Sequence, residues 1–73
     1  MIEIVNATSH LTARRRAVLR AMIERGLWDV KAGRTVYRLE SIGDRYKAKI
    51  TENEANDYGK MVPKTQTAEF SIR

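Results

Sequence analysis

The sequence predicts an α+β domain in which one amphipathic helix packs on a three- or four-stranded, mostly antiparallel sheet. Two observations predict this fold. Helix start and stop signals bracket residues 13–25, and apolar residues alternate with polar ones between Thr35 and Ile50 and again near residue 70. The chain has 73 residues and no internal repeat, which suits a small core. We therefore expect residues 1–73 to form a single domain.

The first segment, "MIEIV", alternates with Ile2 and Ile4 on one side, a short strand pattern, and a polar link "NATSH" follows it. Thr12 then offers an N-cap hydroxyl, and Gly26 can adopt the left-handed conformation that ends a helix. At 100° per residue, five apolar residues form one helical stripe that should face the core. They are Leu11, Val18, Leu19, Met22 and Ile23.

The region after the helix predicts a loop and then a hairpin. Leu27 and Trp28 should fold back on the last helical turn, and "DVKAGR" is interpreted as a loop. Gly43 and Asp44 make a two-residue turn signal between two alternating runs. This turn places one apolar set on the inner face of the hairpin. Its members are Tyr37, Leu39, Tyr46, Ala48 and Ile50.

Two interpretations are open for the segment that follows the hairpin. Thr51 and Glu54 have capping-box spacing, so a single helical turn that ends at Gly59 is one possibility, with the nearby carboxylates as helix-start acids. A loop is the other, because Asn and Asp are common in turns. After Pro63, "TAEFSIR" alternates again and predicts a final strand.

Composition argues against several classes of function. The chain has no cysteine and one histidine, His10, so we expect no disulfide, no metal site and no cysteine nucleophile. The acidic residues Glu52, Glu54 and Asp57 lack the spacing of a calcium loop, and no glycine-rich phosphate loop is present. We expect neither catalysis nor a cofactor. The absence of a signal sequence and of a long apolar run predicts a cytoplasmic protein that does not contact a membrane.

The charge balance is strongly basic, with 14 Lys and Arg residues against 9 Asp and Glu residues and a net charge of +5. Such proteins often bind nucleic acid or acidic protein surfaces, although an excess of this size also serves solubility alone. The positions of the cations along the chain are needed to decide between nucleic-acid binding, protein binding and solubility.

Four arginines lie in or near the first turns of the predicted helix: Arg14, Arg15, Arg16 and Arg20. Cations there face the positive end of the helix dipole, which is unfavourable, so their clustering favours a partner outside the fold. A solvated helix face is the alternative. We predict that these arginines form one partner-binding group.

The outward side of the hairpin carries a second group. Its members are Val36, Arg38, Ile42, Arg45, Lys47 and Lys49. Tyr37 and Tyr46 face inward in the same register, which leaves no aromatic platform for stacked bases. Exposed Val36 and Ile42 among charges favour a protein contact with an apolar centre and a charged rim. A winged-helix interpretation lacks a recognition helix between residues 27 and 34.

Across its length, from "MIEIVNATSH" through "RRRAVLRAMIERGLW" and "RYKAKITENE" to "AEFSIR", the chain resembles the small RNA-polymerase-binding regulators of lytic Xanthomonas phages. The resemblance implies a non-enzymatic protein that contacts the β′ and β subunits of the host polymerase, and we expect it to be a monomer. It also implies inhibition of sigma-dependent initiation and passage through terminators. The rival class is a DNA- or RNA-binding protein whose helix and hairpin contact phosphates.

Overall fold

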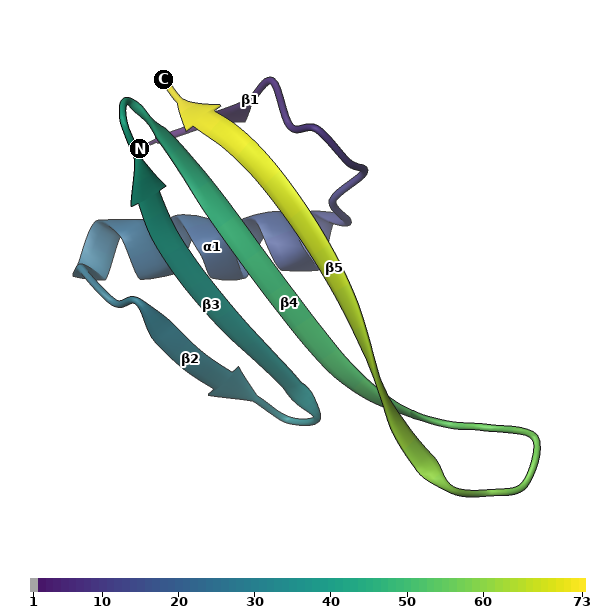
Figure 1. Cartoon of the computed structure of the whole chain (residues 1–73). Coiled ribbons are helices and arrows are strands. Elements are labelled where there is room, and N and C mark those ends of the chain that lie inside the picture. Colours follow the sequence, from purple (N-terminus) through teal and green to yellow (C-terminus); the bar gives the residue numbers. More distant parts are fainter. Residues whose placement is uncertain (1) are drawn as a thin grey trace.

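The computed structural model describes residues 2–73, and it places one helix across one face of a curled, five-stranded antiparallel sheet (Figure 1). The strand order is β1-β5-β4-β3-β2. In chain order the elements are β1 (Ile4–Val5), α1 (Ala13–Arg25), β2 (Asp29–Ala32), β3 (Thr35–Ile42), β4 (Arg45–Ala55) and β5 (Met61–Ile72). The α+β class is confirmed, but the sheet has five strands where three or four were expected.

Local capping signals set both ends of α1 where the sequence predicts them. The Thr12 hydroxyl accepts a hydrogen bond from the backbone N–H of Arg15 at 3.2 Å, and Gly26 ends the helix with a φ of 68°. The backbone N–H of Leu27 donates to the carbonyl of Met22 at 2.8 Å. The expected fold-back therefore occurs in the backbone. The Trp28 ring instead stacks on Tyr46 of the sheet, with centroids 6.4 Å apart.

The β3–β4 hairpin has the register that its turn and alternation predict. Ile42 lies opposite Arg45, Leu39 opposite Ala48, and Tyr37 opposite Ile50. The inner residues of the central pairs are buried, because α1 covers this side of the sheet. The core therefore lies between helix and sheet. Its buried apolar residues are Ile4, Leu11, Leu19, Met22, Tyr37, Leu39, Ala48, Ile50, Ala68 and Phe70.

Two segments differ from the sequence-based expectation. The predicted loop after Trp28 contains strand β2, which pairs with β3 through Val30↔Tyr37 and returns through a two-residue turn at Gly33. The helical turn considered after Thr51 is absent from the described chain, because β4 continues to Ala55 and pairs with β5. Glu52 and Glu54 are therefore strand residues.

The last strand is confirmed and is longer than expected. β5 begins at Met61 and includes Pro63, which a strand tolerates where it forms a sheet edge. The first strand is shorter than "MIEIV": only Ile4 and Val5 pair with β5, and Met1 lies outside the described residues. The link after β1 follows β5 closely, since the backbone N–H of Thr8 donates to the carbonyl of Glu69 at 2.9 Å.

Candidate protein-binding surface

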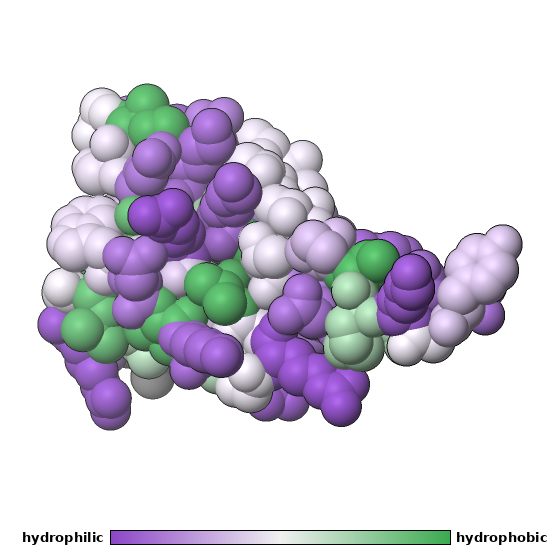
Figure 2. Space-filling view, turned by 60° about the horizontal axis from the view of Figure 1, so that its bottom comes forward, coloured by the Kyte–Doolittle hydropathy of each residue, from purple (hydrophilic) through white to green (hydrophobic). Residues whose placement is uncertain are grey.

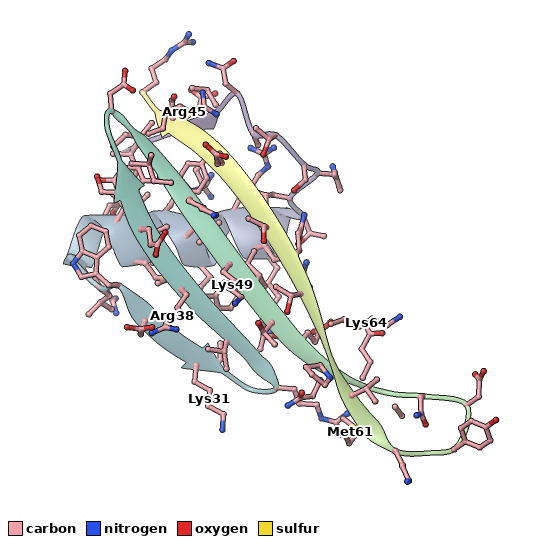
Figure 3. All side chains as sticks on the ribbon, viewed as in Figure 1. Lys31, Arg38, Arg45, Lys49, Met61 and Lys64 are labelled. Carbon is pink, nitrogen blue, oxygen red and sulfur yellow. The ribbon has the colours of Figure 1, made fainter. Side chains whose placement is uncertain are left out.

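The sheet has one face that the helix does not cover, here called the outer sheet face. Side chains alternate along each strand, so the residues next to the buried ones point away from α1. Figure 3 shows Arg38 and Lys49 on this face and Lys31 at the β2 edge. The outer sheet face consists of Asp29, Lys31, Val36, Arg38, Glu40, Ile42, Arg45, Lys47, Lys49, Thr51, Thr65, Thr67, Glu69 and Ser71.

Sheet pairing moderates the positive charge of this face. Glu40, Lys47 and Glu69 lie side by side in one cross-strand row. Asp29 and Arg38 share the next row with Lys49. The outer sheet face thus carries five cations and three acids, a net charge of +2. The three acids come from β2, β3 and β5, so the surface is basic without being uniformly positive.

Two of its four hairpin cations already have partners within the chain. Nε of Arg38 lies 3.1 Å from Oδ1 of Asp29. Arg45 donates to the backbone carbonyl of Asn6 at 3.0 Å, which ties the N-terminal link to the sheet. Lys47 and Lys49 form no ion pair with another residue of the described chain. Lys49 is also exposed, whereas Lys47 is half-buried between Glu40 and Glu69, so Lys49 is the more accessible of the two to an external anion.

The outer sheet face has two depressions, one on its β2 side and one over β3 and β4. One depression of about 450 Å³ is lined by residues of β2, β3 and β4 and by Trp28. A smaller one of about 240 Å³ is lined by Val36, Arg38, Lys49 and Thr51. Arg38 and Lys49 line both, so a charged ridge separates two shallow hollows.

The exposed apolar residues of the face do not form one centre. Val36 is 40% exposed and Ile42 is 45% exposed. They lie at opposite ends of β3, with Arg38 and Glu40 between them on the same side. The expectation of an apolar centre with a charged rim is therefore wrong in its arrangement. The face has a charged middle with an apolar residue at each end.

Two of the four helix arginines predicted to bind a partner hold the fold together. Arg15 forms a salt bridge with Glu52 and donates to the side chain of Gln66. Arg16 donates to the backbone carbonyls of Leu11 and Ile4 at 3.1 and 3.2 Å. The inference that arginines in the first turn need an external partner fails for this pair, because β4, β5 and β1 supply acceptors.

Arg14 is exposed and Arg20 is half-buried, and both lie on the helix layer. The structure does not bring them together with the outer sheet face, because α1 covers the opposite side of the sheet (Figure 1). The exposed apolar residues within α1 are alanines: Ala13, Ala17 and Ala21. The helix layer thus offers cations with little apolar surface, and a flat partner cannot contact both layers at once.

Sequence reasoning missed several residues of this surface. Asp29 and Lys31 were assigned to a loop, although the alternation of Val30 and Ala32 is the signal that places them on a strand. The position of Glu69 beside Lys47 follows only from the β4–β5 register. Pairing between strands distant in sequence has no local signal.

Comparison of the chain with protein-family models, with curated proteins and with solved structures finds no match. Within residues 2–73, no helix is long and apolar enough to cross a membrane. Over the same residues, no three His, Asp or Glu side chains lie close enough together to hold a metal ion. Fold and surface together define a small basic α+β domain with one open, charged sheet face.

Proposed function

We propose that this protein is a non-enzymatic regulator of transcription that binds bacterial RNA polymerase through its outer sheet face. It acts in the cytoplasm of a phage-infected host, contacts the β′ and β subunits, disfavours sigma-dependent initiation and allows transcription to pass terminators. The partner is taken from the resemblance to the small phage regulators, and the contact surface is taken from the geometry above.

One observation carries the choice of surface. The outer sheet face combines Lys47 and Lys49, which form no ion pair within residues 2–73, with exposed apolar side chains at Val36 and Ile42. Protein interfaces need both, since apolar contacts supply affinity and complementary charges speed association and select the partner. Within α1 the exposed apolar residues are alanines, which offer less apolar surface than Val36 and Ile42. An acidic polymerase surface with apolar residues is the chemistry that fits.

A pull-down tests the proposal. The tagged protein is incubated with bacterial lysate, treated with nuclease, and washed at two salt concentrations. We expect the large polymerase subunits to remain bound after nuclease treatment. The double variant Lys47→Glu/Lys49→Glu should lose them. The matched control Arg14→Glu/Arg25→Glu makes the same charge change on the helix layer and should retain them.

Nucleic-acid binding is the second candidate. It is favoured by the presence of cations on both layers, with Arg14 and Arg34 lining a further cleft of about 470 Å³ at the start of α1. A chain of phosphates can wrap around such a molecule, and its affinity would fall steeply with salt. Recovery of nucleic acid alone, lost at moderate salt and reduced equally by both double variants, would replace the polymerase proposal with this one.

A further inference from the structure

The β4–β5 hairpin extends beyond the rest of the sheet. The last β3–β4 pair is Thr35↔Glu52, whereas β4 and β5 stay paired to Ala55↔Met61. Residues 53–63, here called the arm, therefore form a two-stranded ribbon with no third strand and no helix beside it (Figure 1). The molecule measures 43 × 22 × 21 Å as a result. Isolated hairpins are only marginally stable, so this ribbon adds little to the stability of the fold.

The tip of the arm is nevertheless fixed by hydrogen bonds. Oδ1 of Asn56 accepts from the backbone N–H groups of Tyr58 and Lys60, at 2.9 and 3.0 Å. The backbone of Asn56 pairs with Lys60 at 2.8 Å, and Gly59 closes the turn with a φ of 76°. At the base, Glu54 and Lys64 form a salt bridge of 3.3 Å. A loop held in one conformation loses less entropy when it binds.

This fixed tip presents apolar side chains to solvent. Tyr58 is 88% exposed and Met61 is 50% exposed, and neither belongs to the core. Figure 2 shows apolar residues gathered on the arm, separated from those of the body by polar residues. By strand alternation, one side of the arm carries Asn53, Ala55, Met61 and Pro63, with no charge. Tyr and Met are enriched at protein interfaces, and Tyr is a frequent anchor residue.

The charge of the arm separates it from the rest of the chain. Residues 53–63 contain Glu54, Asp57 and Lys60, a net charge of −1, so the remaining residues carry +6. A stacking site for nucleic acid would place cations around the tyrosine, whereas the arm has two acids, Glu54 and Asp57, and one cation, Lys60. The arm therefore fits a neutral, apolar pocket in a protein.

We infer that the arm is a second contact element, which inserts Tyr58 and Met61 into an apolar pocket of the protein that binds the outer sheet face. This inference rests on the proposed function, in which that protein is RNA polymerase. Ala55 and Met61 lie on the same side of the β4–β5 ladder as Lys49. The two strands cross at the base of the arm (Figure 1), so a partner that contacts both the arm and the outer sheet face has to follow this twist. Two joined contacts raise affinity beyond either one, because the second forms at high effective concentration.

A second copy of this chain is a poorer occupant. A fully buried aromatic side chain removes about 150–250 Å² from solvent. Two arm tips packed on each other would thus bury far less than the roughly 1,200–2,000 Å² of a stable interface. A larger partner with a preformed pocket can bury more area, because it can contact the outer sheet face as well as the arm.

The test measures binding of purified bacterial RNA polymerase core enzyme to the full chain and to three variants. Tyr58→Ala and Met61→Ala remove the apolar anchors, and Tyr58→Phe is the matched control that keeps the ring. We expect each alanine variant to weaken binding at least about tenfold and Tyr58→Phe to change it less than about threefold. Unchanged thermal unfolding confirms that the alanine variants fold. A photo-crosslinking residue at position 58 should attach to a polymerase subunit.

The outcomes separate the two proposals. No binding of the unaltered protein to polymerase overturns the proposed function and the arm contact together. Tight binding of the unaltered protein with equally tight binding of Tyr58→Ala overturns the arm contact alone. Two further results would overturn the arm contact. If Tyr58→Ala loses binding to single-stranded RNA, the tip binds RNA. If Tyr58→Ala changes the protein from a dimer to a monomer in sedimentation, the tip binds a second copy of the chain.

Discussion

Nη2 of Arg15 lies 3.6 Å from Oε2 of Glu52, which connects the first turn of α1 to the middle of β4. The Thr35 hydroxyl donates to the other oxygen of the same carboxylate at 3.1 Å. Arg15 also donates to Gln66 of β5. A single guanidinium thus joins helix and sheet, at a position where the helix dipole alone disfavours a cation.

Arg15→Glu should therefore destabilise the fold. The change places two carboxylates together and removes the bond to Gln66, with an expected loss of about 1–2 kcal/mol in the free energy of unfolding. Arg14→Glu is the control, because Arg14 is exposed and has no such bond; it should be neutral or stabilise by a few tenths of a kcal/mol. Urea denaturation of both variants measures the difference. Equal stability would show that the Arg15 contacts contribute nothing.

The aromatic stack across the sheet carries a larger share of stability. Tyr46 stacks on the fully buried Phe70, with ring centroids 5.8 Å apart, and on Trp28. Phe70→Ala should cost about 3–5 kcal/mol, a large part of the stability of a domain of this size. Phe70→Leu fills more of the space and should remain folded at 25 °C. Circular dichroism during thermal unfolding checks both. A folded Phe70→Ala protein with an unchanged Tm would contradict this.

Asn56→Ala should loosen the arm without affecting the body. It removes both side-chain hydrogen bonds at the tip, while the residues of the core keep every contact. We expect amide exchange at Tyr58 and Lys60 to become faster and global stability to change by less than about 0.5 kcal/mol. Ser41→Ala, in β3 and distant from the tip, serves as the control. If amide exchange at Tyr58 and Lys60 stays slow in Asn56→Ala, strand pairing alone fixes the tip of the arm.

Asp29→Asn should increase the attraction of the outer sheet face for an acidic partner. The change releases Arg38 from its exposed ion pair, which contributes at most about 1 kcal/mol to stability. We expect the association rate with polymerase to rise a few fold at low salt and the gain to shrink as salt increases. Glu24→Gln makes the same charge change on the helix layer and should have a smaller effect. Stopped-flow binding distinguishes the two.

The sequence predicts α1 and the β3–β4 hairpin accurately, because each is defined by neighbours in the chain. Thr12 and Gly26 mark the helix, and Gly43 sets a register that the alternating faces support independently. The extension of β4 was not predicted. The capping-box pair Thr51 and Glu54 favours a helical turn locally, and pairing with residues 61–65 overrides it.

The binding surface, too, could be predicted only where neighbours in the chain determine it. Alternation alone places Val36, Ile42 and Lys49 outward, and the structure agrees. The roles of Arg15 and Arg16 could not be predicted, because their acceptors belong to strands that only the tertiary fold brings near. Local helix energetics shows that these arginines need a favourable contact, and it does not show whether the contact lies inside or outside the molecule.

The pairing of β1 with β5 affects the order in which parts of the chain fold. Ile4 meets Ile72, and the backbone groups of Glu3 and Arg73 bond each other at 3.1 and 2.9 Å. Contacts so distant in sequence close only after the intervening chain has been synthesised and ordered. β1 lies at the edge of the sheet with β5 as its neighbour, so its strand pairing can form only after β5 has been made. The N-terminal segment is therefore the final piece of the sheet to dock, and we expect it to be the first to detach.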